Sequence, residues 1–115
     1  MSIFDFIVNS ARTEWKPLVE KNIPYPGVFV KSLRYDGATQ RSTTILLKFE
    51  PGSSYPYHNH PGGEEIFVLD GRVTIEGAEL ATGDYLYTPP GYKHAVRSEE
   101  GCTLLLMIPE EVEIL

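Results

Sequence analysis

Hydrophobic residues gather in short runs that alternate with polar positions, and glycine or proline separates one run from the next. Ten glycines and nine prolines are spread along the chain. No stretch of about 11 residues has a helical period. Short strands with regular turn signals favour an all-β sandwich or barrel. The runs are rich in Val, Ile, Leu, Thr, Tyr and Phe, and they predict strands over 28–33, 42–49, 57–60, 64–69, 72–76, 85–88, 94–98 and 102–108.

The two ends of the chain are less regular. Ser2, followed three residues later by Asp5, predicts a short N-terminal helix. Residues 12–24 are expected to lie irregularly against the barrel, with Trp15 and Leu18 as anchors. The length fits one domain. We expect a single domain over 1–115, made of an N-terminal arm (1–24), a barrel (25–108) and an exposed acidic tail (109–115).

Some predicted strands are apolar on both faces. In 64–69, Ile66 and Val68 share the side of Glu64, whereas Phe67 and Leu69 take the other side. The run 102–108 repeats this pattern. A strand that is apolar on both sides is covered on both sides, but a barrel has only one interior. A second sheet layer or the N-terminal segment could cover the outside, and we favour a homodimer.

Charge and composition exclude some classes of binding partner and indicate the cellular compartment. The net charge is −6, and the lysines and arginines are scattered, so no basic stripe is available for nucleic acid. No apolar run approaches the ~20 residues of a membrane span, and the start is a poor signal peptide. Cys102 is the only cysteine and reads as a small buried strand residue. We expect a cytoplasmic protein without nucleic-acid or membrane partners.

The three histidines and one glutamate carry the candidate chemistry. His58 and His60 are two residues apart, so in a strand both face one side, with Cα atoms about 6.6 Å apart. Glu64 opens an apolar inward face after a Pro-Gly-Gly turn, where a carboxylate is unfavourable unless it is paired or bound to metal. Glu65 faces the opposite side and is read as a surface charge. His94 begins a strand after another Pro/Gly turn.

We therefore predict a metal site made of His58, His60, Glu64 and His94. Three nitrogens and one oxygen suit one divalent transition metal per chain: Zn, Fe, Mn, Ni or Cu. A lone histidine is more often a surface or core residue than a ligand. All three histidines of this chain open or lie in predicted strands that follow Pro/Gly turns, and this shared pattern favours the metal interpretation. A metal-free barrel that merely kept these residues is the weaker alternative.

At these residues a family likeness becomes visible. The segments 52–71 and 83–98 resemble the two cupin motifs at every spacing, except that Ser98 stands where the second motif usually has Asn. The likeness implies a jelly-roll barrel, also called a double-stranded β-helix, and implies that His58, His60, Glu64 and His94 are the ligands. The segments 15–18, 27–33, 60–65, 89–91 and 101–102 resemble the narrower group of ChrR-like cupin domains.

Two functions are left open at this stage. The first is a metal-dependent enzyme, dioxygenase-like, that acts on a small organic molecule, with Glu64 as ligand or base. The second is a non-catalytic sensor or binding module with a closed zinc site. For the enzyme, the expected apolar pocket wall is Ile45, Leu47, Phe49, Ile66, Val68 and Val96. The tyrosines near the motifs, which pack at the core or the rim or hydrogen-bond the substrate, are Tyr55, Tyr57, Tyr85, Tyr87 and Tyr92.

Overall fold

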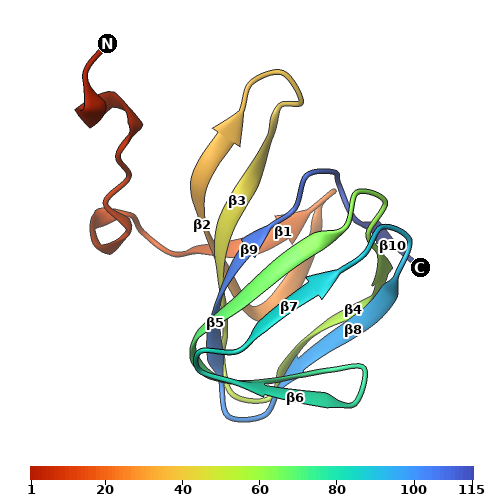
Figure 1. Ribbon diagram of the computed structural model, residues 1–115. Helices are drawn as coiled ribbons and strands as arrows, with labels where there is room; N and C mark the ends of the chain where they lie inside the picture. The colour runs from red at the N-terminus through yellow and green to blue at the C-terminus, as the bar shows by residue number, and fades with distance from the viewer.

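Ten antiparallel strands form one curled sheet in the computed structural model, which describes residues 1–115 (Figure 1). The sheet wraps around a single apolar interior, which confirms the predicted all-β, jelly-roll class of fold. The strands are β1 (Lys16–Glu20), β2 (Ile23–Asp36), β3 (Arg41–Phe49), β4 (Ser53–Asn59), β5 (Glu64–Ile75), β6 (Ala78–Ala81), β7 (Tyr85–Thr88), β8 (Lys93–Ser98), β9 (Cys102–Met107) and β10 (Glu113–Ile114).

The long strand β5 joins the two halves of the curled sheet. Its first half pairs with β7 on one side and β9 on the other, and its second half pairs with β6 and β8. Beyond β9 the order continues through β3 and β2 to β1, and beyond β8 it continues through β4 to β10. His58 and His94 lie on β4 and β8 in one half of the curled sheet, whereas Glu64 opens the part of β5 that pairs with β7 and β9 in the other half, so the predicted ligands come from both halves (Figure 1).

Side-chain alternation along the strands builds the core. Ile66 and Val68 on β5 are almost fully buried, whereas Phe67 and Leu69 are 36% and 42% exposed. Alternate residues of a strand face opposite sides of the sheet, so this pattern confirms the assignment of the two faces. The core is Leu18, Val28, Leu47, Phe49, Tyr55, Ile66, Val68, Val73, Ile75, Leu80, Val96, Cys102, Leu104, Leu106 and Ile108.

The N-terminal region contains more regular structure than its sequence predicts. Residues expected to be irregular form β1, which pairs with β2 through a hairpin at Lys21 and Asn22. Both turn residues have positive φ, 50° and 67°, which is the geometry of a type I′ turn that Asn-Gly would signal more clearly. Pro17 obscures the strand because proline lacks the ladder donor and is confined to edge strands.

The first residues form a single 3-10 turn at Ile3–Phe6 instead of the predicted short helix. The predicted cap is present: the Ser2 hydroxyl accepts from the Phe4 amide, and the Asp5 carboxylate accepts from the Ser2 amide. None of the turn's residues is buried. A cap can start a helix, but most helical stability in proteins comes from packing, so without a buried face the turn does not continue.

The separation of the predicted strands 64–69 and 72–76 by a turn at Asp70-Gly71 is wrong, because both residues lie inside β5. Strand β5 runs through both residues without reversing, and its actual hairpin lies at Glu76 and Gly77, both with positive φ. At Gly71 a Cβ would lie 2.2 Å from the Gly101 carbonyl oxygen, and the backbone has a φ of +87°. This glycine serves the close approach of β9 to β5 where β5 changes partners.

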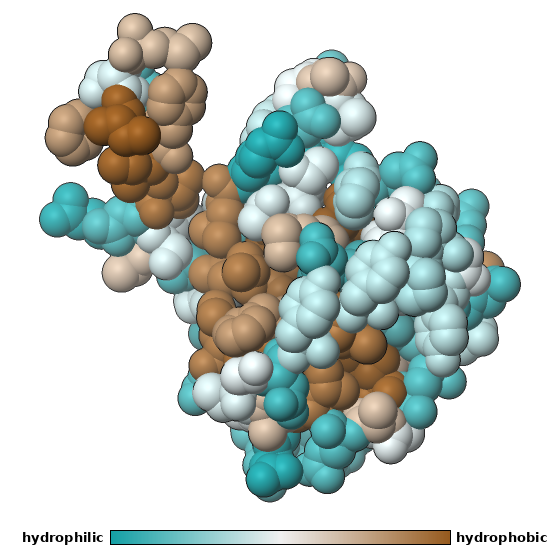
Figure 2. Space-filling view, viewed as in Figure 1, coloured by the Kyte–Doolittle hydropathy of each residue, from teal (hydrophilic) through white to brown (hydrophobic).

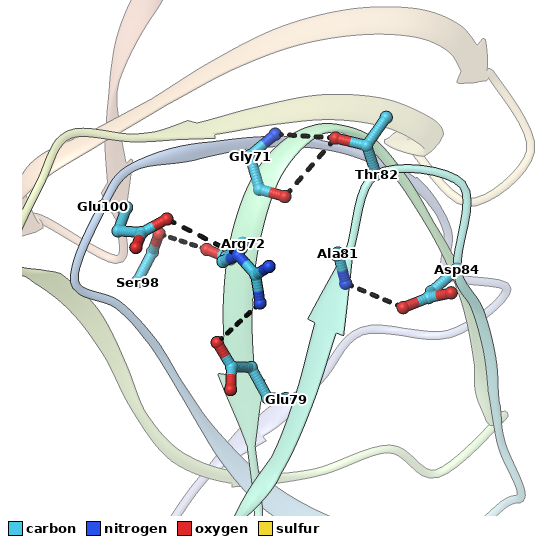
Figure 3. Close-up of polar contacts among 8 residues, drawn as sticks. All are labelled: Gly71, Arg72, Glu79, Ala81, Thr82, Asp84, Ser98 and Glu100. Carbon is cyan, nitrogen blue, oxygen red and sulfur yellow. Dashed lines mark hydrogen bonds and ion pairs between the residues drawn. The ribbon is translucent and has the colours of Figure 1, made fainter.

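Polar contacts hold this corner of the barrel (Figure 3). Ser98 is fully buried and donates to the Arg72 carbonyl at 2.6 Å. Asp84 accepts from the Ala81 amide at 2.8 Å, and the Gly71 amide donates to the Thr82 hydroxyl at 3.1 Å. Ser98, the one departure from the second motif, therefore has a structural role that ties β8 to β5.

The acidic tail is exposed except at Val112, but part of it is paired with the barrel. Its residues 113–114 form β10, which pairs with β4 beside His58. The Asn59 amide group donates to Glu113 at 2.8 Å, and the Leu115 amide donates to the Tyr57 carbonyl at 3.2 Å. The end of the chain thus lies along the strand that carries the first histidine (Figure 1).

Candidate metal centre

Three imidazoles and one carboxylate meet inside the barrel. His58 lies near the end of β4, Glu64 begins β5, and His94 is opposite His58 in the β4–β8 ladder. The ring centroids of His60 lie 4.4 Å from His58 and 4.3 Å from His94. The three imidazoles offer ligand atoms within 4.8 Å of one another, and all three are buried. These histidines could hold a metal ion.

The loop between β4 and β5 places the side chains of His60 and Glu64 together on the inner side of the barrel. The His60 carbonyl accepts from the Gly63 amide at 3.1 Å and from the Gly91 amide at 2.9 Å. Gly63 has a φ of +78°, and a Cβ there would lie 2.9 Å from the Thr88 carbonyl oxygen. Glycine is therefore required for this reversal.

Hydrogen bonds fix which nitrogen of two rings faces the centre. His58 Nδ1 lies 2.6 Å from the Pro56 carbonyl oxygen, and His60 Nδ1 lies 2.8 Å from the Tyr92 carbonyl oxygen. A carbonyl oxygen only accepts, so both Nδ1 atoms carry the proton. In a neutral ring the Nε2 atom then presents a lone pair, and backbone partners of this kind are usual for metal-ligating histidines.

The Glu64 carboxylate faces two of these nitrogens. Its Oε1 atom lies 3.2 Å from His60 Nε2 and 3.5 Å from His94 Nε2. All three atoms are buried and lack a hydrogen-bond partner of good geometry. Neighbouring ligands of one ion at about 2.0–2.2 Å lie roughly 2.8–3.6 Å apart. A bare nitrogen lone pair facing a buried carboxylate needs a cation or a proton between them.

The protonation equilibria of the cluster follow from burial and mutual charge. Burial, reinforced by His60 and His94, lowers the pKa of His58 to about 4. Burial also opposes a charge on His60, but the Glu64 carboxylate and the Tyr92 carbonyl outweigh it and raise the pKa. Burial would raise the pKa of Glu64, yet the facing imidazoles lower it. The carboxylate is therefore ionised at neutral pH.

An apolar cavity of about 50 Å³ adjoins this cluster. Its walls come from both halves of the sheet and include two of the cluster residues, His58 and Glu64. A single water needs about 10–15 Å³ in this measure, so the cavity holds only a few water-sized groups. The lining is Leu18, Glu20, Ile45, Leu47, Phe49, Tyr55, His58, Glu64, Ile66, Val96, Leu104, Leu106, Ile108 and Val112.

Sequence reasoning found most of the cavity wall but missed one polar group. Of the six expected wall residues, only Val68 does not line the cavity. Among the motif tyrosines, Tyr55 alone lines the cavity, and its hydroxyl donates to the Glu20 carboxylate. Glu20 was missed because β1 was not predicted, and without that strand no pattern places the residue inside the barrel. Glu65 lies outside as expected and accepts from Tyr85 at 2.6 Å.

Family comparison agrees with the fold and the motif pattern. The family model of the ChrR cupin-like domain matches residues 4–109, so the chain belongs to that family of cupins. The chain is 33% identical over 81 residues to the DNA damage-repair/toleration protein DRT102 of Arabidopsis thaliana, a match that covers 65% of this chain and 24% of that protein. It is 29% identical over 76 residues to the dimethylsulfoniopropionate lyase DddQ of Ruegeria pomeroyi, covering 62% and 38%. The chain thus matches well under half the length of either relative.

Solved cupin structures share the fold at low sequence identity. A candidate acetylacetone dioxygenase from Methylibium petroleiphilum has a TM-score of 0.82 and 18% identity, covering 95% of this chain and 79% of its own. The acetylacetone dioxygenase from Acinetobacter johnsonii has a TM-score of 0.75 and 17% identity, covering 88% and 71%. The polyketide cyclase RemF from Streptomyces resistomycificus has a TM-score of 0.73 and 20% identity, covering 95% and 84%. At these identities the likeness establishes the fold.

Membrane insertion through a helix has no support in the structure. None of its helical segments combines the length and the apolar character that a spanning helix requires.

Proposed function

We propose that the chain is a metal-dependent enzyme that acts on a small organic molecule, with dioxygenase-like chemistry. His58, His60, Glu64 and His94 would hold one divalent transition metal per chain. The observation that carries this proposal is the convergence of partnerless buried atoms on Glu64 Oε1, next to an apolar cavity. When bound, such an ion supplies Lewis acidity and, if it is redox-active, electron-transfer chemistry with dioxygen. A dioxygenase places both oxygen atoms in the product, so it needs no separate reductant.

The protein's own groups define what the substrate must be. The aliphatic wall excludes water and favours a mostly apolar ligand, and the cavity volume of about 50 Å³ restricts it to a few non-hydrogen atoms unless side chains move. His58 and Glu64 orient the polar end of the ligand toward the cluster. Sequence relatives and structural neighbours whose names give a dioxygenase, a lyase or a cyclase support a small-molecule substrate.

The Glu20–Tyr55 pair supplies a second polar point in the cavity. Tyr55 is 7% exposed, its ring lies 4.8 Å from that of His58, and its hydroxyl reaches Glu20. A substrate group that donates a hydrogen bond could replace the tyrosine hydroxyl on the Glu20 carboxylate. This pair would therefore select substrates with a donor a few ångströms from the metal-binding end.

Metal analysis and substrate trials test the proposal together. Protein purified without oxygen should contain about one Fe, Mn, Ni or Cu per chain and should consume dioxygen with acetylacetone as the probe. Dimethylsulfoniopropionate, followed by NMR, tests lyase chemistry at the same centre. A protein that binds no transition metal after reconstitution, while remaining folded, would overturn the metal-dependent proposal.

The second candidate is a sensor or binding module with a closed zinc site. It is favoured by the donor set itself, since three imidazoles and one carboxylate can complete a tetrahedral Zn site without an open position. Tightly held four-coordinate zinc, with neither oxygen uptake nor turnover of the probes, would favour this candidate over the enzyme.

We further infer that the protein acts in the cytoplasm as a homodimer. Outward apolar residues on β5 and β9, such as Phe67 and Leu105, support the dimer. Size-exclusion chromatography with light scattering checks it, and a monomer at all concentrations would contradict it.

A further inference from the structure

The N-terminal arm, defined here as Ile3–Val8, exposes an unusual amount of apolar surface. In Figure 1 it projects from the barrel, and Figure 2 shows it as a brown, hydrophobic extension. It makes no side-chain contact with the core cluster. Its exposed fractions are 67% for Ile3, 79% for Phe4, 64% for Phe6, 58% for Ile7 and 48% for Val8.

The exposed apolar area of the arm is large enough for an interaction site. Taking about 200 Å² for a fully exposed large apolar side chain, these five exposed fractions leave roughly 600 Å² of apolar surface on the arm. Contiguous patches of this size mark interaction sites. Two arms, together with the equal area that they would cover on a partner, exceed the about 1,200 Å² of a specific interface.

Contacts at the base of the arm direct it away from its own barrel. The Lys31 ammonium donates to the Ser10 carbonyl at 2.6 Å and lies over the Trp15 ring. Ile7 and Asn9 are extended on either side of Val8. Packing the arm onto its own sheet would require a reversal within these residues, next to the 3-10 turn Ser10–Arg12.

An apolar surface on the outside of the barrel matches the arm. Strand register places Lys31, Leu46, Leu105, Phe67 and Tyr85 side by side across β2, β3, β9, β5 and β7. Lys31 and Leu46 are only 9% and 8% exposed, so the part of this row that is open to a partner is Leu105, Phe67 and Tyr85. Leu69 extends this outer surface along β5. Figure 2 shows brown surface on the barrel beside the arm as well as on the arm.

We propose that the arm of one chain packs across the outer face of β9, β5 and β7 of a second copy, and that the second copy returns its arm in the same way. This proposal rests on the inferred homodimer and specifies how it is built. The six residues of the arm reach at most about 20 Å when extended, whereas three neighbouring strands span roughly 10 Å, so the arm can cross the face. Mutual exchange is the closed twofold arrangement that self-complementary surfaces form.

Disulfide trapping distinguishes the possible positions of the arm. The double variant Phe4→Cys/Leu69→Cys, oxidised and run without reductant, is expected to form chains linked in pairs. Migration as a monomer that carries an internal disulfide would show that the arm folds onto its own sheet, and would overturn the proposal. Failure to form any disulfide would overturn it as well. Phe4→Cys/Glu99→Cys is the control, because Glu99 is exposed on the β8–β9 turn, and Cys102 stays buried in all variants.

A measurement of the dimer dissociation constant distinguishes the proposed role of the arm from the existence of the dimer. Phe4→Asp/Phe6→Asp should raise the dimer dissociation constant at least tenfold in sedimentation equilibrium and leave metal content unchanged. If the variant dimerises like the wild type, the arm proposal fails while the homodimer stands. If the wild type is a monomer, both fail. Ser2→Asp/Asn9→Asp, at two exposed positions that flank the apolar run of the arm, is the matched charge control.

Discussion

His60 and Tyr92 connect the two halves of the candidate metal centre: His60 Nδ1 donates to the Tyr92 carbonyl oxygen at 2.8 Å. Tyr92 lies two residues before His94, so the bond ties the loop after β4 to the start of β8. The His60 carbonyl also accepts from Gly91. The same residue thus orients its own ring and fixes the approach of the other ligand strand, which makes it the position where a substitution should affect metal binding most.

His60→Ala is expected to abolish metal binding while the barrel remains folded. The substitution removes a predicted ligand but leaves the backbone bonds of His60 intact. Metal content after reconstitution and the circular dichroism spectrum measure the two effects. The histidines are the only three in the chain, so no other imidazole can replace the ligand. Metal retained at full stoichiometry would show that His60 is not a ligand.

The two adjacent glutamates offer a matched comparison. Glu64 is 4% exposed and faces the imidazoles, whereas Glu65 lies on the opposite face and binds Tyr85. Loss of a group that merely supports a ligand costs about 10–100-fold in affinity, so Glu64→Gln should weaken metal binding by at least that much. Glu65→Gln should change it less than about twofold. Competition with a chelator measures both, and equal effects would contradict the assignment of Glu64.

Metal affinity should fall as the pH drops below about 6.5, because the ligand form of histidine is neutral. In the metal-free protein the raised pKa of His60 makes it the first site where protons compete with metal. His58, with a pKa of about 4, stays neutral until the solution is strongly acidic. Chelator competition across pH 5–8 should therefore show a steady loss toward acid. Full occupancy at pH 5 would count against histidine ligation.

In the metal-free protein, the direction in which protonation changes the free energy of unfolding differs among the cluster residues. The lowered pKa of His58 means that the unfolded chain takes up a proton first, so its contribution to stability is lost as the pH falls from about 6.5 toward 4. The lowered pKa of Glu64 acts in the same direction at lower pH. His60 acts oppositely, and its contribution is lost as the pH rises through its raised pKa. Urea unfolding of the apo protein at several pH values measures the sum.

The sequence predicted the strands with strong alternation and all four cluster residues, but not the segments that close the barrel. The turns that precede His60, Glu64 and His94 are marked by proline and glycine, so their spacing is visible in the sequence. Strand β1 has neither apolar alternation nor a typical turn, and its pairing with β2 depends on Pro17 and on Lys21–Asn22, which tertiary contacts permit. The role of Gly71 could not be read locally, since it depends on Gly101, thirty residues away.

Tyr55→Phe tests the polar pair in the cavity. Removing the hydroxyl leaves Glu20 without its buried donor, and a hydrogen bond to a charged group contributes about 1.5–3 kcal/mol. We expect a loss of stability toward the lower end, because Glu20 is only half-buried, with unchanged metal content. Urea unfolding measures the loss. Tyr57→Phe is the control, since Tyr57 is 45% exposed, and an equal effect of both changes would exclude a special role for the pair.

Two glycines with similar φ values allow the stability cost of backbone strain to be distinguished from the cost of a steric clash. Gly71 and Gly77 have φ values of +87° and +78°, but a Cβ at Gly71 would lie 2.2 Å from the Gly101 carbonyl oxygen, whereas Gly77 has nothing within 4 Å. The left-handed conformation alone costs a non-glycine residue about 1–2 kcal/mol. Gly77→Ala should therefore lose about that much stability. Gly71→Ala should lose several kcal/mol more, since β9 must move away from β5 to admit the methyl group. Urea unfolding of the two variants gives the difference, and equal losses would mean that the close approach of the two strands contributes nothing to the stability of the barrel.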